Sequence, residues 1–216
     1  MSVLLATLAD RLQRAVPQRD GLPDDYEELA REAVAQLSQD LPIITASTIQ
    51  VVAGTASYTL PADFLSLIEL GGAPAADGVI LGGNGIVPLA AGWTEANYIE
   101  GGSLRIDPTP AYSAARTLRY AACHVLAGGV YPRLSENGAR VALLYGQYLA
   151  LSAQANAQAG DGWSYKIGDE SVDKRGLGAA IQSQAMAALT NYNNAIRPLK
   201  GYGAQYKANQ FAGVEV

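Results

Sequence analysis

The chain has 216 residues, a length that fits one domain or one domain with an insertion. Charged residues make up only 16% of it and its net charge is −5. This balance disfavours a general nucleic-acid binder, because neutralising phosphates requires a basic face. No apolar run is long enough to span a membrane, and a single cysteine excludes an internal disulfide.

The charges are unevenly distributed along the chain. Residues 1–40 hold eight acids and four bases, whereas residues 134–216 hold six acids and seven bases. We therefore expect the two ends to prefer different partners.

Two amphipathic helices are predicted near the start of the chain. In the first, Leu5, Leu8 and Leu12 recur at helical spacing between Ser2, a candidate N-cap, and Pro17. Charged residues interrupt its apolar face, which is typical of a mature helix and not of a signal peptide.

The second helix carries the stronger signals. Asp24 and Glu27, three residues apart, resemble a capping box, and Pro42 ends the segment. Between them one apolar face is predicted to enter the core. Its members are Tyr26, Leu29, Ala30, Ala33, Val34, Leu37 and Leu41.

The hydrophobic period changes to that of β-strands in the insertion at about residues 47–126. β-branched residues and alternation predict short strands, and Gly101-Gly102 predicts a hairpin with a two-residue turn. Residues 71–92 contain seven glycines, two prolines and one charge, which predicts a long loop or flap. The predicted strands are Thr48–Val52, Tyr58–Leu60, Leu65–Leu70, Tyr98–Glu100, Ser103–Ile106 and Thr117–Leu126.

Helical spacing returns in the last third of the chain. It predicts one helix of about 23 residues from Glu136 and a second from about Gly176 to Ile196. Residues 198–216 have no helical period and are predicted to be an extended tail. The expected fold class is therefore α+β and mainly α. It is a single helical domain over residues 1–197 with the β insertion and the tail.

Residues that could carry catalysis are scarce. The only histidine, His124, adjoins the only cysteine, Cys123, and neighbours in a strand point to opposite faces, so they cannot act as base and nucleophile. Asp169, Glu170 and Asp173 lack the spacing of a calcium loop. Paired carboxylates of a hydrolase stay possible, although nothing singles out a pair. We expect no enzyme activity, no cofactor and no metal.

The tail offers a better candidate for a binding site. Bases and aromatic residues alternate there with no acid before Glu215, which suits docking into an acidic, aromatic-lined groove of another protein. A solvated tail with ordinary charges is the alternative, although aromatic residues are unusual in such segments. The candidate residues are Arg197, Lys200, Tyr202, Tyr206, Lys207 and Phe211.

Two short motifs carry a resemblance to a known family. These are Tyr58-Thr59-Leu60-Pro61-Ala62-Asp63-Phe64-Leu65 and Trp163-Ser164-Tyr165-Lys166-Ile167-Gly168-Asp169-Glu170-Ser171-Val172-Asp173, set between an N-terminal helical pair and long C-terminal helices. The whole arrangement resembles the head-to-tail adaptor (connector) proteins of tailed bacteriophages.

The resemblance implies a structural protein of the virion neck, made in the host cytoplasm. It implies a homo-oligomeric ring of about twelve copies, closed by heterologous contacts. Such a ring would sit under the portal protein, offer a platform to a tail, stopper or neck protein, and let genomic DNA pass without specific binding. On this hypothesis the tail residues bind the portal. Trp163, Tyr165, Lys174 and Arg175 are candidates for the interface between subunits.

One alternative function belongs to another class. The chain could be a monomeric binding module whose glycine-rich flap, residues 71–92, closes on a sugar or peptide ligand. The low charge and the basic, aromatic tail favour the adaptor.

Overall fold

The fold was analysed in a computed structural model that describes residues 2–17, 25–71, 79–82, 85–88, 96–111, 113–159, 164–167, 170–173 and 177–211. The chain forms two compact units. The helical unit comprises residues 1–41 and 124–216, and the β unit comprises residues 42–123. Helices and small antiparallel sheets together confirm the α+β class.

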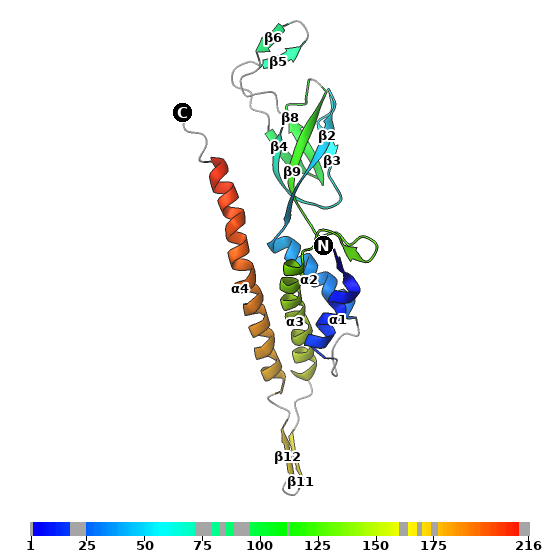
Figure 1. The fold of residues 1–216 in the computed structure, drawn as a ribbon, viewed down its shortest axis with the longest axis vertical. Coiled ribbons are helices and arrows are strands. Elements are labelled where there is room, and N and C mark those ends of the chain that lie inside the picture. Colours follow the sequence, from blue (N-terminus) through cyan, green and yellow to red (C-terminus); the bar gives the residue numbers. More distant parts are fainter. Residues whose placement is uncertain are drawn as a thin grey trace. The chain divides into compact units, whose positions relative to one another are not determined.

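Within the described ranges, four helices build the helical unit. Helix α3 lies between α4 on one side and α1 with α2 on the other (Figure 1). The strand pair β1–β10 joins the start of the chain to the segment before α3, and β11 and β12 form an antiparallel hairpin. The elements are α1 (Leu5–Ala15), α2 (Tyr26–Asp40), α3 (Glu136–Ala159), α4 (Leu177–Phe211), β1 (Val3–Leu4), β10 (Val130–Tyr131), β11 (Ser164–Ile167) and β12 (Glu170–Asp173).

The predicted N-caps of the first two helices were wrong. Helix α1 begins after Leu4, which makes no side-chain cap, because the residues before the helix pair with β10 instead. Helix α2 is capped by Asp25, whose side chain accepts a hydrogen bond of 3.0 Å from the backbone N–H of Glu28. The predicted cap, Asp24, lies outside the described residues.

The core of the helical unit is made of leucines and small residues. Leu8, Leu12 and Leu37 are fully buried, as the helical spacing predicted. Helix α3 approaches α1 closely at Gly146, where an added Cβ would lie 3.2 Å from a methyl carbon of Leu12. This small residue therefore sets the spacing of the helices.

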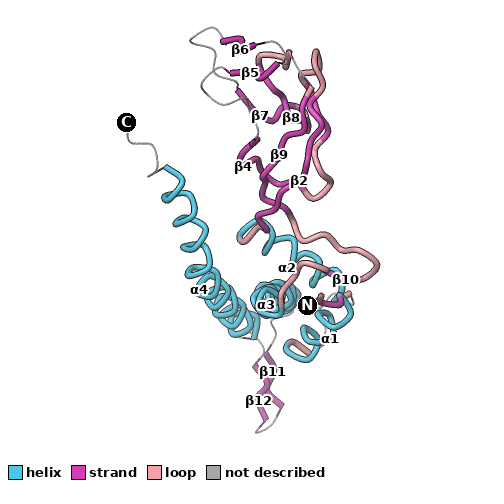
Figure 2. Tube along the Cα trace, turned by 45° about the horizontal axis from the view of Figure 1, so that its top comes forward, coloured by secondary structure: helices cyan, strands magenta, loops and turns pink. Residues whose placement is uncertain are grey.

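Two three-stranded antiparallel sheets share the core of the β unit (Figure 2). Their strand orders are β2–β9–β4 and β3–β8–β7, and β5 and β6 form a separate hairpin. Leu104, Ile106 and Leu118 are almost completely buried in the shared core. The strands are β2 (Ile43–Val51), β3 (Ser57–Thr59), β4 (Phe64–Gly71), β5 (Val79–Gly82), β6 (Gly85–Pro88), β7 (Ala96–Glu100), β8 (Ser103–Asp107) and β9 (Ala114–Ala122).

The predicted hairpin is confirmed. Strands β7 and β8 pair in register, and Gly101 and Gly102 between them have φ angles of 56° and 76°. Two consecutive positive φ angles are typical of the type I′ turn, which suits glycine. By contrast, β2 and β9 both begin earlier than predicted, and β9 ends at Ala122, before Cys123.

Two segments predicted to lack regular structure contain it. The glycine-rich stretch holds the β5–β6 hairpin, because Val79–Leu81 and Ile86–Val87 are short β-prone runs on either side of its glycines. The tail was predicted to be extended, but α4 continues through Pro198 to Phe211. Extending an existing helix needs no new nucleus, so one proline and two glycines do not end it. Residues 212–216 lie outside the described residues.

Candidate functional site on the C-terminal helix

The histidine and the cysteine lie outside the strand that was predicted to point them to opposite faces. Both follow the end of β9, and their backbone N–H groups donate in different directions, Cys123 to the carbonyl of Asp63 and His124 to the hydroxyl of Ser38. Burial lowers the pKa of His124. No group of three or more potential metal ligands occurs among the described residues.

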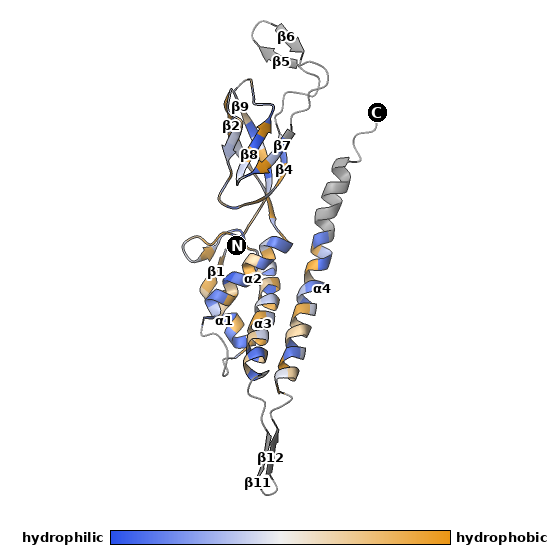
Figure 3. Cartoon of the chain, turned by 180° about the vertical axis from the view of Figure 1, so that it is seen from behind, coloured by the Kyte–Doolittle hydropathy of each residue, from blue (hydrophilic) through white to orange (hydrophobic). Residues whose placement is uncertain are grey.

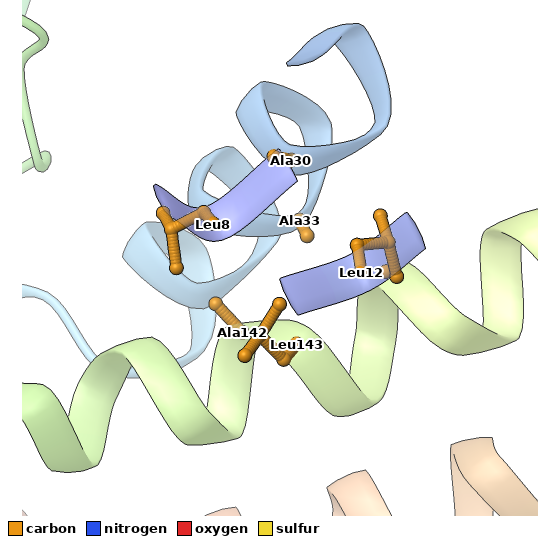
Figure 4. A pocket seen from close by; sticks show the side chains of 7 residues that line it. Leu8, Leu12, Ala30, Ala33, Ala142 and Leu143 are labelled. Carbon is orange, nitrogen blue, oxygen red and sulfur yellow. The ribbon is translucent and has the colours of Figure 1, made fainter. Parts of the chain in front are cut away.

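The apolar gap between α1, α2 and α3 is not a ligand site. It is lined by leucine, alanine and glycine and leaves no room for a water molecule (Figure 4). An open depression of about 430 Å³ beside α1 and the start of α2 is lined by three carboxylates, those of Asp10, Asp25 and Glu27. Asp10 and Glu27 each form an ion pair with an arginine on their own helix, and Asp25 caps α2. The three carboxylates of the depression are therefore engaged in contacts of α1 and α2 themselves.

The carboxylate of Asp40, at the C-terminus of α2, accepts three side-chain hydrogen bonds. One oxygen accepts hydrogen bonds from the hydroxyl of Tyr192 at 2.6 Å and from the amide of Gln36 at 2.9 Å. The other accepts from the ammonium of Lys200 at 2.6 Å. Because Tyr192 and Lys200 both belong to α4, Asp40 anchors that helix to the end of α2.

The electrostatics of Asp40 follow from these contacts. Desolvation alone would raise its pKa, and a negative charge at a helix C-terminus is unfavourable. Hydrogen bonds from Lys200, Tyr192 and Gln36, together with the lysine charge, outweigh desolvation and lower the pKa of Asp40. The pKa of Tyr192 is raised, first by burial and then by its bond to the carboxylate. The contact is therefore a carboxylate bound by a phenol and an ammonium.

Aromatic packing between Tyr192 and α3 also holds α4 in place. Tyr192 is only 2% exposed, and its ring lies 5.1 Å from the ring of Tyr145 on α3, centroid to centroid. Tyr148 continues the cluster, 5.5 Å from Tyr145. Tyr192 thus presents an apolar ring to α3 and a hydroxyl to Asp40, a dual role that suits tyrosine.

The six residues predicted to bind a partner all lie in the C-terminal half of α4, close to or after the contact of Lys200 with Asp40. Arg197 and Lys200 are exposed on α4, and Lys200 is held by Asp40. The other four lie on the last turns of α4, where the structure describes the backbone only. A period of 3.6 residues places positions 200, 207 and 211 on one face and positions 202 and 206 on the opposite one, so the structure does not bring all six together.

The candidate interface residues are less completely described. Tyr165 lies in β11, opposite Val172 of β12. Trp163, Lys174 and Arg175 lie outside the described residues. Their proposed role stays a prediction.

Sequence reasoning missed Asp40 and the function of Tyr192. Tyr192 lies within the helix predicted from Gly176 to Ile196, and Asp40 is one of the eight acids of residues 1–40, but neither was singled out. The spacing of Tyr192 and Lys200, eight residues apart, places both on one side of a helix. Nothing in the sequence links that side to a carboxylate more than 150 positions earlier.

Comparison with known families identifies the class of protein. The SU10 adaptor protein family matches residues 2–209. The chain therefore belongs to this family, and its resemblance to the head-to-tail adaptors of tailed phages is confirmed. No curated protein matches the chain.

Membership of an adaptor family makes this a structural phage protein that interacts with other components of the particle. No described helix is long and apolar enough to cross a membrane. In Figure 3, hydrophilic and hydrophobic residues alternate along α3 and the coloured part of α4, so neither helix shows a continuous apolar stretch there.

Proposed function

We propose that the protein is a head-to-tail adaptor that forms a ring under the portal at the neck of the virion. Copies of the chain bind the portal on one side and offer a platform to a tail or stopper protein on the other. Genomic DNA passes through the lumen. The observation that carries this proposal is the family match over nearly the whole chain.

The charge of the chain suits a channel for DNA. Each copy carries a net charge of −5, so a ring of copies would repel the phosphate backbone and not trap it. The low charged fraction, 16%, also leaves much neutral surface for contacts between copies. A closed ring requires such contacts to be heterologous, with different surfaces of each copy meeting.

In this proposal the portal is bound by the C-terminal part of α4. The candidate surface begins with Arg197 and Lys200 and continues with bases and aromatic residues to Phe211. Asp40 and Tyr192 fix the base of this segment on the helical unit. Its last turns follow Lys200 in the chain, and we propose that they meet the partner. Trp163, Tyr165, Lys174 and Arg175 are proposed to lie between neighbouring copies.

The experiment is light scattering of the purified protein, alone and with portal rings from the same phage genome. The full chain is expected to form a stoichiometric complex with the portal. A chain truncated after Lys200 keeps the anchor to Asp40 and loses only residues 201–211 of α4. The rest of the chain should stay folded, but it should no longer bind the portal. A double substitution, Tyr202→Ala with Tyr206→Ala, tests one face of the deleted segment without shortening the chain.

Three results would argue against parts of this proposal. Full binding by the truncated chain would exclude the C-terminal segment as the portal contact. A full chain that stays monomeric and ignores the portal would overturn the adaptor function. The binding-module function would then become the leading hypothesis, with ligand-dependent protection of residues 71–92 as its test.

A further inference from the structure

Strand β2 is an unprotected edge of its sheet. It pairs with β9 over all nine of its residues without a bulge, and no described segment pairs with its other side. It contains no charge, proline or glycine, and six of its residues are β-branched. Natural proteins usually protect such an edge with a charge, a proline or a bulge.

The opposite edge of the same sheet shows the usual protection. Strand β4 has two register shifts against β9 and carries Glu69, which forms an ion pair with Arg119. Bulges twist an edge away from a neighbour, and charges disfavour pairing. The two edges of one sheet therefore differ, and only β2 has the features of a strand that pairs with another chain.

The hydrogen bonds identify which groups of β2 are free. The N–H of Cys123 donates to Asp63, at the start of β4, so the groups of Ala122 point the other way, toward β2. Ile43, the partner of Ala122, therefore bonds inward, and the pattern alternates along the strand. The backbone N–H and C=O groups that face outward belong to Ile44, Ala46, Thr48 and Gln50.

The side chains of the same four residues are exposed. Ile44, a large apolar residue, has 58% of its surface accessible. Unpaired backbone groups and exposed side chains, with the apolar Ile44 among them, thus coincide on one strand. An added strand would form hydrogen bonds with the unpaired backbone groups of β2. Its side chains would cover the exposed side chains of β2.

The chain itself contains a matching extended segment. The β5–β6 hairpin has no charged residue in either strand, and among the described residues it pairs with nothing but itself. A lone two-stranded hairpin is marginally stable, so it gains from a third strand. The other separate hairpin, β11–β12, carries Lys166, Glu170 and Asp173 and suits an uncharged edge poorly.

We propose that the β5–β6 hairpin of one copy adds to the free edge of β2 in the next copy, so that a continuous sheet crosses each subunit boundary. This contact joins two different surfaces, as a closed ring requires. The inference rests on the proposed ring and specifies one of its contacts.

The first test blocks the edge without disturbing the sheet. Thr48→Pro removes one outward N–H and leaves every bond to β9 in place, whereas Thr48→Val keeps the backbone groups and changes only the side chain. Light scattering measures the protein concentration at which rings form, alone and on portal rings. Thr48→Pro should raise that concentration at least tenfold, and Thr48→Val should not change it.

The second test identifies the occupant of the edge. In a hairpin-less variant, residues 79–88 are replaced by a glycine–serine linker of equal length. At the concentration at which the wild-type chain forms rings, neither this variant nor Thr48→Pro should form them alone. A mixture of the two retains one intact edge and one intact hairpin per pair of chains and should give 1:1 dimers that grow no further.

The outcomes separate the inference from the proposed function. Rings of Thr48→Pro that form as readily as wild-type rings would overturn the inference alone, as would normal rings of the hairpin-less variant. Failure of the mixture to give dimers would exclude the hairpin as occupant. A wild-type chain that never forms a ring, even on the portal, would overturn the proposed function and this contact with it.

Discussion

The helical unit and the β unit position their elements by different means. In the helical unit, α3 approaches α1 through Gly146, and α4 is fixed by hydrogen bonds from Tyr192 and Lys200 to Asp40. In the β unit, backbone ladders fix the strands, and branched side chains fill the space between two sheets. The placement of the helices thus depends on a few specific side chains. The placement of the strands depends on a repeated backbone pattern.

Truncating a core side chain should have the largest effect on stability. The effect should stay within the unit that contains the side chain. Leu12 in the helical unit and Leu104 in the β unit are both completely buried. Replacing either with alanine should cost about 2–5 kcal/mol, because it loses apolar burial and leaves a cavity. Hydrogen exchange read by peptide should show faster exchange in the helical unit for Leu12→Ala and in the β unit for Leu104→Ala. Equal acceleration in both units by either substitution would show that they unfold together.

The anchor of α4 should have the next largest effect. Asp40→Ala leaves the buried hydroxyl of Tyr192 and the ammonium of Lys200 without their partner, which should cost about 1–3 kcal/mol of unfolding free energy. Asp10→Ala is the matched control, since it removes an exposed ion pair with Arg14 and should cost less than about 0.5 kcal/mol. Urea unfolding followed by circular dichroism measures both. Equal effects of the two substitutions would contradict the role of Asp40 as an anchor.

The features that could be predicted from the sequence are those that leave a local pattern in it. Leu8, Leu12 and Leu37 repeat at helical spacing, and Gly101-Gly102 marks its turn, so the helices and the hairpin were predictable from local patterns. The contacts of Asp40 join residues far apart in the chain and leave no local pattern. The continuation of α4 past Pro198 was not predicted, because proline and glycine usually end a helix. Here the helix is already formed before Pro198 and continues through these residues.

The hairpin turn offers a smaller test in the β unit. Gly102 has a φ of 76°, where a side chain is strained, so Gly102→Val should cost about 1–2 kcal/mol. Gly101→Asn is the control, because Asn-Gly is a favoured pair in a type I′ turn, and it should be nearly neutral. Thermal unfolding compares the two variants. A neutral Gly102→Val would mean that the turn is not held in this conformation.

The smallest expected effect is a dependence of stability on pH that comes from His124. Burial lowers its pKa below the ordinary value of 6.5, so the unfolded chain binds a proton more readily than the folded one. Stability from this residue is complete above pH 6.5 and is lost as the pH falls through the lowered pKa. Urea unfolding at pH 8 and pH 5 should therefore show a loss of stability that is smaller in His124→Gln. Asp40→Asn is the control, because a carboxyl whose pKa lies below 3.8 does not titrate in this range. An unchanged pH dependence in His124→Gln would exclude His124 as its source.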